Sequence, residues 1–459
     1  MAVAGKEVRS FIKTGSEPVH VHSMGQIVAP FHPATLARSA NVAEQSPTRL
    51  AVSSGKAPSA LGRLTHIEGL RAYLAFWVLI CHVLWTSGYT EDLLSGLPRL
   101  LVHGDSAVDL FIIISGFVVF FLLDKQQETY GQFIVRRFFR LFPLFIVLFF
   151  LAIPLSRVTW WNATHSSLYW EPGQLAYVTA LVPSWWHNLY WHIPLHLLML
   201  HGVVPDALIR DSPSAFLVAA WSVSLEWQFY LVAPLAYAWA VSSRPFRRLR
   251  LCLACMLLFL AARKLFPTMN HGAALPFHLE FFFLGCASYF LYKRNLEKPH
   301  CDTWFPVACS IALFFLFMGG KSQLIVPVAL WIAFLGLVLE HPSSFCSRFL
   351  SPLFTNRLCQ FLGRISYSVY LVHMLPMVLM QRAIFKCLPQ LSHIAHFWIL
   401  FALTAATTIA ASTCLYRLIE APGIKLGRAI AVKLTQRNAT RVLRVRPHCV
   451  VHPAGHSGQ

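Results

Sequence analysis

Long apolar stretches separated by short polar loops make up most of this chain. Each stretch is about 16 to 26 residues long, which is enough for a helix that crosses the hydrocarbon core of a bilayer. We therefore predict an all-α integral membrane protein, a bundle of about ten transmembrane helices. The predicted spans are 68–87, 107–124, 139–155, 216–241, 249–266, 276–292, 303–319, 323–340, 366–386 and 393–418.

The segment 174–201 is apolar enough to span but does not fit this count. If it crossed the membrane, the arginine-rich loops that follow it would lie on the outer side. Its tryptophans and histidines are typical of a segment at headgroup level, so we expect one re-entrant or interfacial element on the outer face.

Composition supports the membrane class, with 56% hydrophobic and 12% charged residues and a mean hydropathy of +0.56. Lys and Arg number 38 against 19 Asp and Glu. Between the predicted spans, fourteen basic residues fall in inside loops and eight in outside loops. This indicates a multi-pass protein of the inner (plasma) membrane with both termini cytoplasmic. No zinc-finger, helicase or RNA-binding pattern accompanies the charge, so we expect no nucleic acid partner.

The two ends differ from the apolar middle. Residues 1–60 are rich in Ser, Pro and Ala and are expected to form a disordered cytoplasmic tail. Residues 61–423 hold the predicted membrane domain. Residues 424–459 are expected to form a basic cytoplasmic tail that rests against anionic headgroups or is disordered.

The stretch Thr65 to His82 carries polar groups in an apolar helix. Glu68 and Arg71 are three residues apart and can pair on one helical face. Arg71 and His82 are eleven residues apart, which places them on the same side of the helix, roughly 16 Å apart along it. Ionisable groups within a membrane helix are usually functional, although a lone histidine is often a packed, hydrogen-bonded residue.

Three more stretches carry candidate chemistry. Asp109 opens the second span, where it caps the helix or belongs to a site, and Ser115 interrupts that span. Glu226 lies in an apolar span with Tyr230 and needs a partner, for which Arg71, His82 or an acceptor hydroxyl are candidates. Basic side chains cluster at the entry to the third span, in Arg136, Arg137 and Arg140.

The two readings of that arginine cluster are a topology anchor and a phosphate site. Arg137 and Arg140 share one helical face, and guanidinium groups suit phosphate. The histidines between 187 and 201 include one pair four residues apart. No carboxylate or cysteine accompanies them, so we predict an interfacial or acceptor contact rather than a metal site.

Together these stretches resemble the membrane-bound acyltransferase family type 3, which O-acylates sugars and related surface polymers in bacteria. The resemblance covers about 61–423, in order, although Glu68, Ala72 and Trp227 depart from the usual residues. The matching signatures are IEGLRAYLAFWVLICH, VDLFIIISGFVVF, RRFFRLFPLF, WSVSLEWQFYLVAP, LGRISYSVYLVH and YRLIEAP.

The resemblance implies an acyl donor, usually acetyl-CoA, that enters from the cytoplasm, and a sugar hydroxyl of a cell-envelope or exported polysaccharide as acceptor. It also implies a glycan or lipid-linked sugar as partner, and polysaccharide-assembly proteins near the enzyme. His82 would be the base or the acyl carrier, with Arg71 on the donor's path. Arg137 and Arg140, with Arg136 beside them, would bind the CoA phosphates. Glu226 and Asp109 would orient the imidazole. The substrate contacts would be Ser115, Tyr230 and His373.

Two other classes stay open on the sequence. Ten helices with buried Arg, His, Asp and Glu also describe a proton-coupled transporter of a glycan or small solute, although no internal repeat is evident. The second open class is a regulatory or scaffold protein that has kept the fold and lost the catalytic activity. The presence of all the expected polar groups argues against this class.

Overall fold

A computed structural model describes residues 60–445, apart from 166–169, 171 and most of 245–272 and 298–324. The predicted tail 1–60 lies outside the described residues except for Ala60. The described residues are helical and confirm the all-α class. The longer helices are α1 (Ala60–Trp85), α3 (Gly104–Gln126), α4 (Tyr130–His165), α5 (Pro172–His187), α7 (Trp221–Ala240), α9 (Leu279–Glu297), α11 (Ile325–Leu339), α15 (Met374–Cys387), α16 (His393–Leu415) and α17 (Ala421–Val445). The shorter ones are α2 (Gly96–Leu101), α6 (Leu189–Leu197), α12 (Phe345–Thr355), α13 (Arg357–Arg364) and α14 (Ser366–Val372).

Several of these helices are long and apolar enough to cross a membrane, as expected of a multi-pass protein. Within the described residues four qualify, at Thr65–Trp85, Gly104–Gln126, Tyr130–His165 and His393–Leu434. A fifth qualifies if α14 and α15, which meet at a 46° bend, form one broken span.

The structure does not show about ten spans, and that count stays a prediction. Two of the predicted spans, 249–266 and 303–319, lie mostly outside the described residues. The apolar segment 174–201 forms parts of α5 and α6, and neither helix qualifies as a span.

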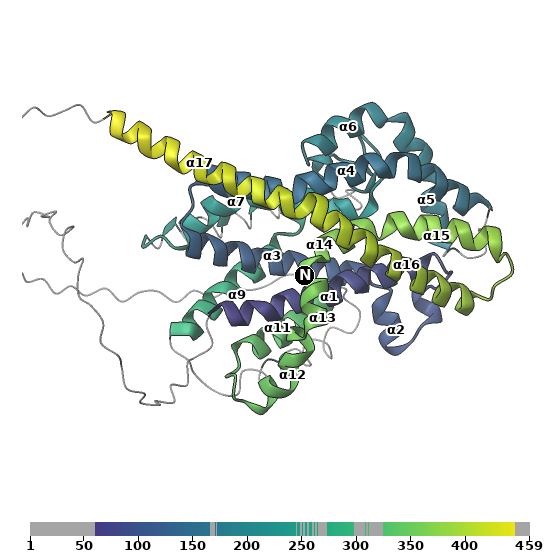
Figure 1. Cartoon of the computed structure of the whole chain (residues 1–459), viewed down its shortest axis with the longest axis horizontal. Helices are drawn as coiled ribbons and strands as arrows, with labels where there is room; N and C mark the ends of the chain where they lie inside the picture. The colour runs from purple at the N-terminus through teal and green to yellow at the C-terminus, as the bar shows by residue number, and fades with distance from the viewer. Residues whose placement is uncertain are drawn as a thin grey trace, which may run out of the picture. The chain divides into compact units, whose positions relative to one another are not determined.

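Helices α1 and α3 lie in the middle of the bundle, and α9 packs closely on α3 (Figure 1). Glycines permit this close approach. A Cβ atom on Gly116 would lie 2.5 Å from the Phe282 carbonyl oxygen, and one on Gly285 would lie 2.0 Å from that of Ile113. Small residues let membrane helices approach backbone to backbone, so α9 holds the segment of α3 that carries Ser115.

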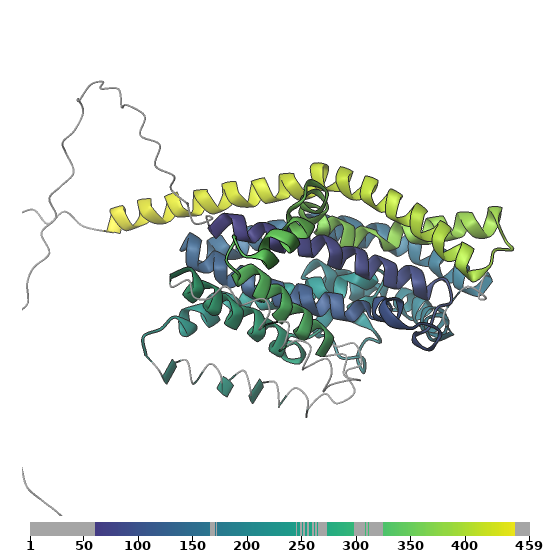
Figure 2. The same ribbon diagram turned by 90° about the horizontal axis from the view of Figure 1, so that it is seen from below.

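Helices α16 and α17 run as one long element along one side of the bundle (Figure 2). A π-helical segment, Tyr416–Glu420, joins them. Such insertions frequently mark functional sites, and here the segment buries Glu420, whose Oε2 accepts a hydrogen bond from Ser368 Oγ at 2.6 Å. The predicted basic tail 424–459 is helical as far as Val445.

Candidate active site

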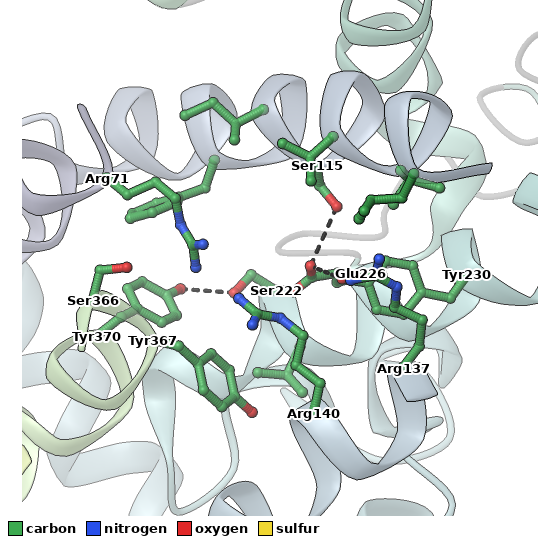
Figure 3. Close-up of a pocket in the computed structure, with 16 residues that line it drawn as sticks. Arg71, Ser115, Arg137, Arg140, Ser222, Glu226, Tyr230, Ser366, Tyr367 and Tyr370 are labelled. Carbon is green, nitrogen blue, oxygen red and sulfur yellow. Dashed lines mark hydrogen bonds between the residues drawn. The ribbon is translucent and has the colours of Figure 1, made fainter. Parts of the chain in front are cut away.

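A cavity of about 210 Å³ lies between α1, α3, α4, α7 and α14. Six of the residues predicted as site residues line it, and they come from four helices. Figure 3 shows the guanidinium groups of Arg71 and Arg140 pointing into the same space. We call this space the arginine cavity. Its polar lining consists of Arg71, Ser115, Arg137, Arg140, Ser222, Glu226, Tyr230, Ser366, Tyr367 and Tyr370.

The arginine cavity carries an excess of positive charge. Arg71, Arg137 and Arg140 line it, and Glu226 is the one carboxylate among the described lining residues. None of these three guanidinium groups forms an ion pair within 4 Å in the described part of the chain. Buried charges are costly unless they are compensated. Three cations around one cavity therefore favour an anionic ligand.

Hydrogen bonds hold Glu226 in place at the edge of this cavity. Ser115 Oγ donates to Glu226 Oε1 at 3.2 Å, and the Tyr230 hydroxyl donates to the same oxygen (Figure 3). Arg137 stacks over the rings of Tyr230 and Phe133, with its guanidinium carbon 5.3 and 5.4 Å from the two centroids. These contacts fix Arg137 and Glu226 on the same wall, which gives the cavity both a preorganised cation and an acceptor oxygen.

Arg136 has a different environment from its two neighbours. It does not line the cavity, and its Nη1 donates to Gln126 Oε1 at 2.7 Å and to Glu128. Successive residues of a helix point about 100° apart, so Arg136 leaves α4 on another side. The contacts of Arg136 join α4 to the end of α3.

His82 lies in a second cavity of about 80 Å³, lined also by residues of α4, α5 and α15. We call it the histidine cavity. Arg71 and His82 thus share helix α1 but line different cavities. Ring contacts connect the two linings. The centroid of Tyr370, which lines the arginine cavity, is 6.4 Å from that of His373, and the His373 centroid is 5.1 Å from that of His82.

The hydrogen bonds of the two histidines determine which nitrogen carries a proton in each neutral ring. His82 Nδ1 lies 2.9 Å from the Val78 carbonyl oxygen, and His373 Nδ1 lies 2.7 Å from that of Tyr370. A carbonyl oxygen only accepts hydrogen bonds, so both Nδ1 atoms carry the proton. The single proton on His82 Nδ1 is then shared between the Val78 carbonyl oxygen at 2.9 Å and His373 Nε2 at 3.2 Å. His82 Nε2 is left with a lone pair, as a general base requires.

Asp109 lies outside both cavity linings. Two other carboxylates, those of Asp105 and Glu280, act electrostatically on it. Asp105, in the first turn of α3, also acts on His82. The sequence analysis selected Asp109 and not Asp105, although both lie near the start of α3, and the predicted role of Asp109 stays a prediction.

Glu420 is a second residue that the sequence analysis did not select. It acts electrostatically on both Arg71 and Arg140, and it lies in the YRLIEAP segment. A carboxylate inside an apolar helix is often functional, so the sequence pattern around Glu420 could have identified it as a candidate. Tyr370 was also missed, although its hydroxyl lies 2.9 Å from Ser222 Oγ on the cavity wall (Figure 3).

A family model described as an acyltransferase domain matches residues 64–417. The chain belongs to the acyltransferase 3 family. The predicted resemblance and the predicted enzyme class, an acyltransferase, are thereby confirmed.

Named relatives of this acyltransferase agree with that assignment. It is 26% identical over 364 residues to the O-acetyltransferase PaAT-1 of Phomopsis amygdali, covering 67% of this chain and 71% of that protein. It is 29% identical over 198 residues to the acyltransferase MdmB of Streptomyces mycarofaciens, covering 43% and 45%. It is 24% identical over 342 residues to the O-acetyltransferase OatA of Staphylococcus aureus, covering 68% and 50%. No solved structure matches the chain.

Proposed function

We propose that this acyltransferase moves an acetyl group from acetyl-CoA to a hydroxyl of its acceptor, with His82 as the catalytic base. The observation that carries the proposal is the arginine cavity, where Arg71, Arg137 and Arg140 converge without ion-pair partners in the described part of the chain. The names of two relatives, both O-acetyltransferases, support acetyl as the acyl group.

The donor's phosphate groups suit the arginine cavity. Guanidinium forks bind phosphate through paired charge-assisted hydrogen bonds, and Arg137 is held for this by its stacking on Tyr230. Arg71 and His82 lie eleven residues apart on α1, roughly 16 Å along the helix axis. The extended pantetheine arm of CoA is long enough to reach from one towards the other.

The chemistry then requires a base at the acceptor hydroxyl. The acceptor O–H gives its proton to His82 Nε2 as its oxygen bonds to the thioester carbonyl carbon. The carbon–sulfur bond breaks, and the CoA sulfur leaves as a thiolate that takes the proton back from the imidazolium. His373 holds the His82 ring through the Nδ1 hydrogen bond at 3.2 Å, and it is a positioning residue.

In the alternative order, the reaction passes through an acyl-imidazole. His82 Nε2 first attacks the thioester carbonyl carbon and the thiolate leaves, and the acceptor oxygen then attacks the acyl carbon on His82. Both orders need the same Nε2 lone pair. In either one, Glu226 and Ser115 stay at the arginine cavity, where they contact the donor.

The predicted location of the reaction follows from the charge distribution of the loops. We infer a multi-pass protein of the plasma membrane with both termini cytoplasmic, so that acetyl-CoA enters from the cytoplasmic side. The acceptor implied by the resemblance, a sugar hydroxyl of a cell-envelope or exported polysaccharide, stays a prediction, as do a lipid-linked sugar partner and polysaccharide-assembly proteins.

Purified protein in lipid nanodiscs, given labelled acetyl-CoA and a panel of alcohols, tests the proposal. We expect label to move into an acceptor ester with the wild-type protein and not with His82→Ala. His393→Ala is the matched control, because His393 contacts the carbonyl of Ser87 away from both cavity linings. Equal ester formation by His82→Ala and wild type would refute the role of His82, and ester formation by neither protein would refute acyl transfer.

A further inference from the structure

Two short helices at the edge of the bundle, α12 and α13, expose large apolar side chains (Figure 1). On α12 these are Phe345, Phe349 and Leu353, which are four residues apart and share one helical face. On α13 they are Leu358 and Phe361. With 11 and 8 residues, the two helices are too short to cross a bilayer. Short amphipathic helices of this kind lie in the membrane interface, with their apolar face among the lipids.

The same two helices are basic. Arg348 on α12 and Arg357 and Arg364 on α13 are exposed, and the segment 341–364 contains no Asp or Glu. Within the described residues, none of the three forms an ion pair within 4 Å, and this includes Glu68, which is exposed on the adjacent turn of α1. Exposed arginines beside exposed apolar side chains are typical of helices that bind anionic lipid headgroups.

The predicted topology agrees with such a partner. The segment 341–364 lies between the predicted spans 323–340 and 366–386, in a loop predicted to be cytoplasmic. The cytoplasmic leaflet of a plasma membrane carries anionic lipids. The exposed arginines therefore face the leaflet whose charge complements their own.

An apolar groove of about 510 Å³ begins at α12 and runs along α1, and we call it the lipid groove. Leu353 lines it and joins it to the exposed apolar face of α12. On α1 the lining extends from Leu70 to Trp77, about 10 Å along the helix axis. The described lining includes no charged side chain, and the hydroxyl of Tyr73 donates to the Leu353 carbonyl oxygen at 2.9 Å. Because α1 is long enough to span, the groove follows the direction of a lipid chain in the bilayer.

We propose that this region binds an anionic phospholipid, with one acyl chain in the lipid groove and its phosphate headgroup at the arginines of α12 and α13. The groove has a volume within the range of about 300–1,000 Å³ that is usual for ligand sites. Arg357 follows Phe354, a residue of the groove lining, by three positions, so a headgroup at the end of the groove is close to it. The inference does not depend on the acyl-transfer reaction.

The bound lipid would also hold the start of α1. A Cβ atom on Gly69 would lie 2.0 Å from the Phe354 carbonyl oxygen, so α12 packs directly on the α1 backbone. Gln360 Nε2 of α13 donates to the Thr65 carbonyl oxygen at 2.8 Å. These contacts lie within two turns of Arg71, so a lipid that fixes α12 and α13 fixes the part of α1 that carries this arginine.

Equilibrium binding in neutral detergent tests the headgroup contact. The full-length protein is titrated with labelled dioleoyl phosphatidylglycerol and with phosphatidylcholine that carries the same chains. We expect the wild-type protein to bind phosphatidylglycerol about tenfold or more tightly than phosphatidylcholine. The double variant Arg348→Gln with Arg357→Gln should lose about fivefold in phosphatidylglycerol affinity per arginine and keep its phosphatidylcholine affinity.

The matched control for charge is Arg210→Gln with Lys386→Gln, which removes two exposed charges from other parts of the chain. It should change phosphatidylglycerol affinity by less than about twofold. Equal affinities of the wild-type protein for the two lipids, or an equal loss in the control variant, would overturn the headgroup assignment.

Filling the groove tests the acyl chain. Ala333 lines the groove from α11, so Ala333→Phe should weaken dioleoyl phosphatidylglycerol about fivefold or more and the dihexanoyl lipid by less than about twofold. Ala406→Phe, at an exposed residue of α16, is the control. Melting curves verify folding, and Leu330→Trp fills the same groove if Ala333→Phe does not fold. Equal losses for both chain lengths would overturn the groove assignment.

Two further measurements address the other occupant and the link to α1. A lipid-free wild-type dimer that Phe349→Ser converts to a monomer would show that this face binds a second copy of the chain, and it would overturn the proposal. Adding phosphatidylglycerol should slow hydrogen exchange over residues 65–73 in the wild-type protein and not in the arginine double variant. Unchanged exchange in the wild-type protein would overturn the link to α1.

Discussion

Arg140 offers the sharpest test of the donor site, because its guanidinium points into the arginine cavity without an ion-pair partner in the described residues (Figure 3). Arg140→Gln keeps a polar side chain and removes the charge. A hydrogen bond to a charged group contributes about 1.5–3 kcal/mol. The KM for acetyl-CoA should therefore rise about 10- to 150-fold, with a matching loss of CoA affinity in equilibrium binding.

Arg136→Gln is the matched control for this experiment. It removes the same charge from the same helix, but Arg136 pairs with Glu128 and does not line the cavity. Because Arg136 lies outside the cavity lining, this variant should change the KM for acetyl-CoA by less than about fivefold.

A second acyl donor without phosphate groups distinguishes a lost phosphate contact from a general disturbance of the site. S-acetylpantetheine carries the same thioester without the nucleotide phosphates, so the wild-type protein should use it with a high KM. Arg140→Gln should add little to that KM, because the phosphate proposed to contact Arg140 is absent. The reasoning fails if Arg140→Gln weakens both thioesters by the same factor, or if Arg136→Gln has an equal effect on acetyl-CoA.

Two further predictions concern the positioning of the base and the packing of the bundle. His373→Leu removes the ring that packs on His82 and the second acceptor of its Nδ1–H, while the Val78 carbonyl oxygen remains, so kcat should fall about 2- to 10-fold with the KM for acetyl-CoA unchanged. A raised KM with normal kcat would instead place His373 at the donor. Gly285→Ala puts a Cβ 2.0 Å from the Ile113 carbonyl oxygen, so steady heating should show a loss of about 1–3 kcal/mol of stability. Gly131→Ala meets nothing within 4 Å and is the control; equal melting temperatures for both variants would contradict the close approach of α3 and α9.

Much of this protein could be predicted from local patterns in its sequence. The lengths of the apolar stretches predicted an all-α membrane protein, and the order of the signatures predicted its family. The spacing of Arg137 and Arg140 placed them on one face of a helix, and both line one cavity. These properties depend on residues within a few turns of each other, for which helical geometry is nearly fixed.

Contacts between distant segments could not be read in the same way. Spacing within α4 could not show that Arg136 pairs with Glu128, because that contact depends on how α3 ends beside α4. The contact between His82 and His373 joins residues 291 positions apart. His373 lies at the 46° bend between α14 and α15. Such a bend depends on how the helices pack, so the sequence pattern does not predict it.

The chain alone therefore determined the class, the family and the set of ionisable groups within the membrane helices, because hydropathy and periodicity are local. Only the tertiary structure decided that Arg71 and His82 line separate cavities and that His373 contacts the His82 ring. The physical reason is that the environment of a side chain depends on which helix packs against it, and that partner is chosen by shape and burial across the whole bundle.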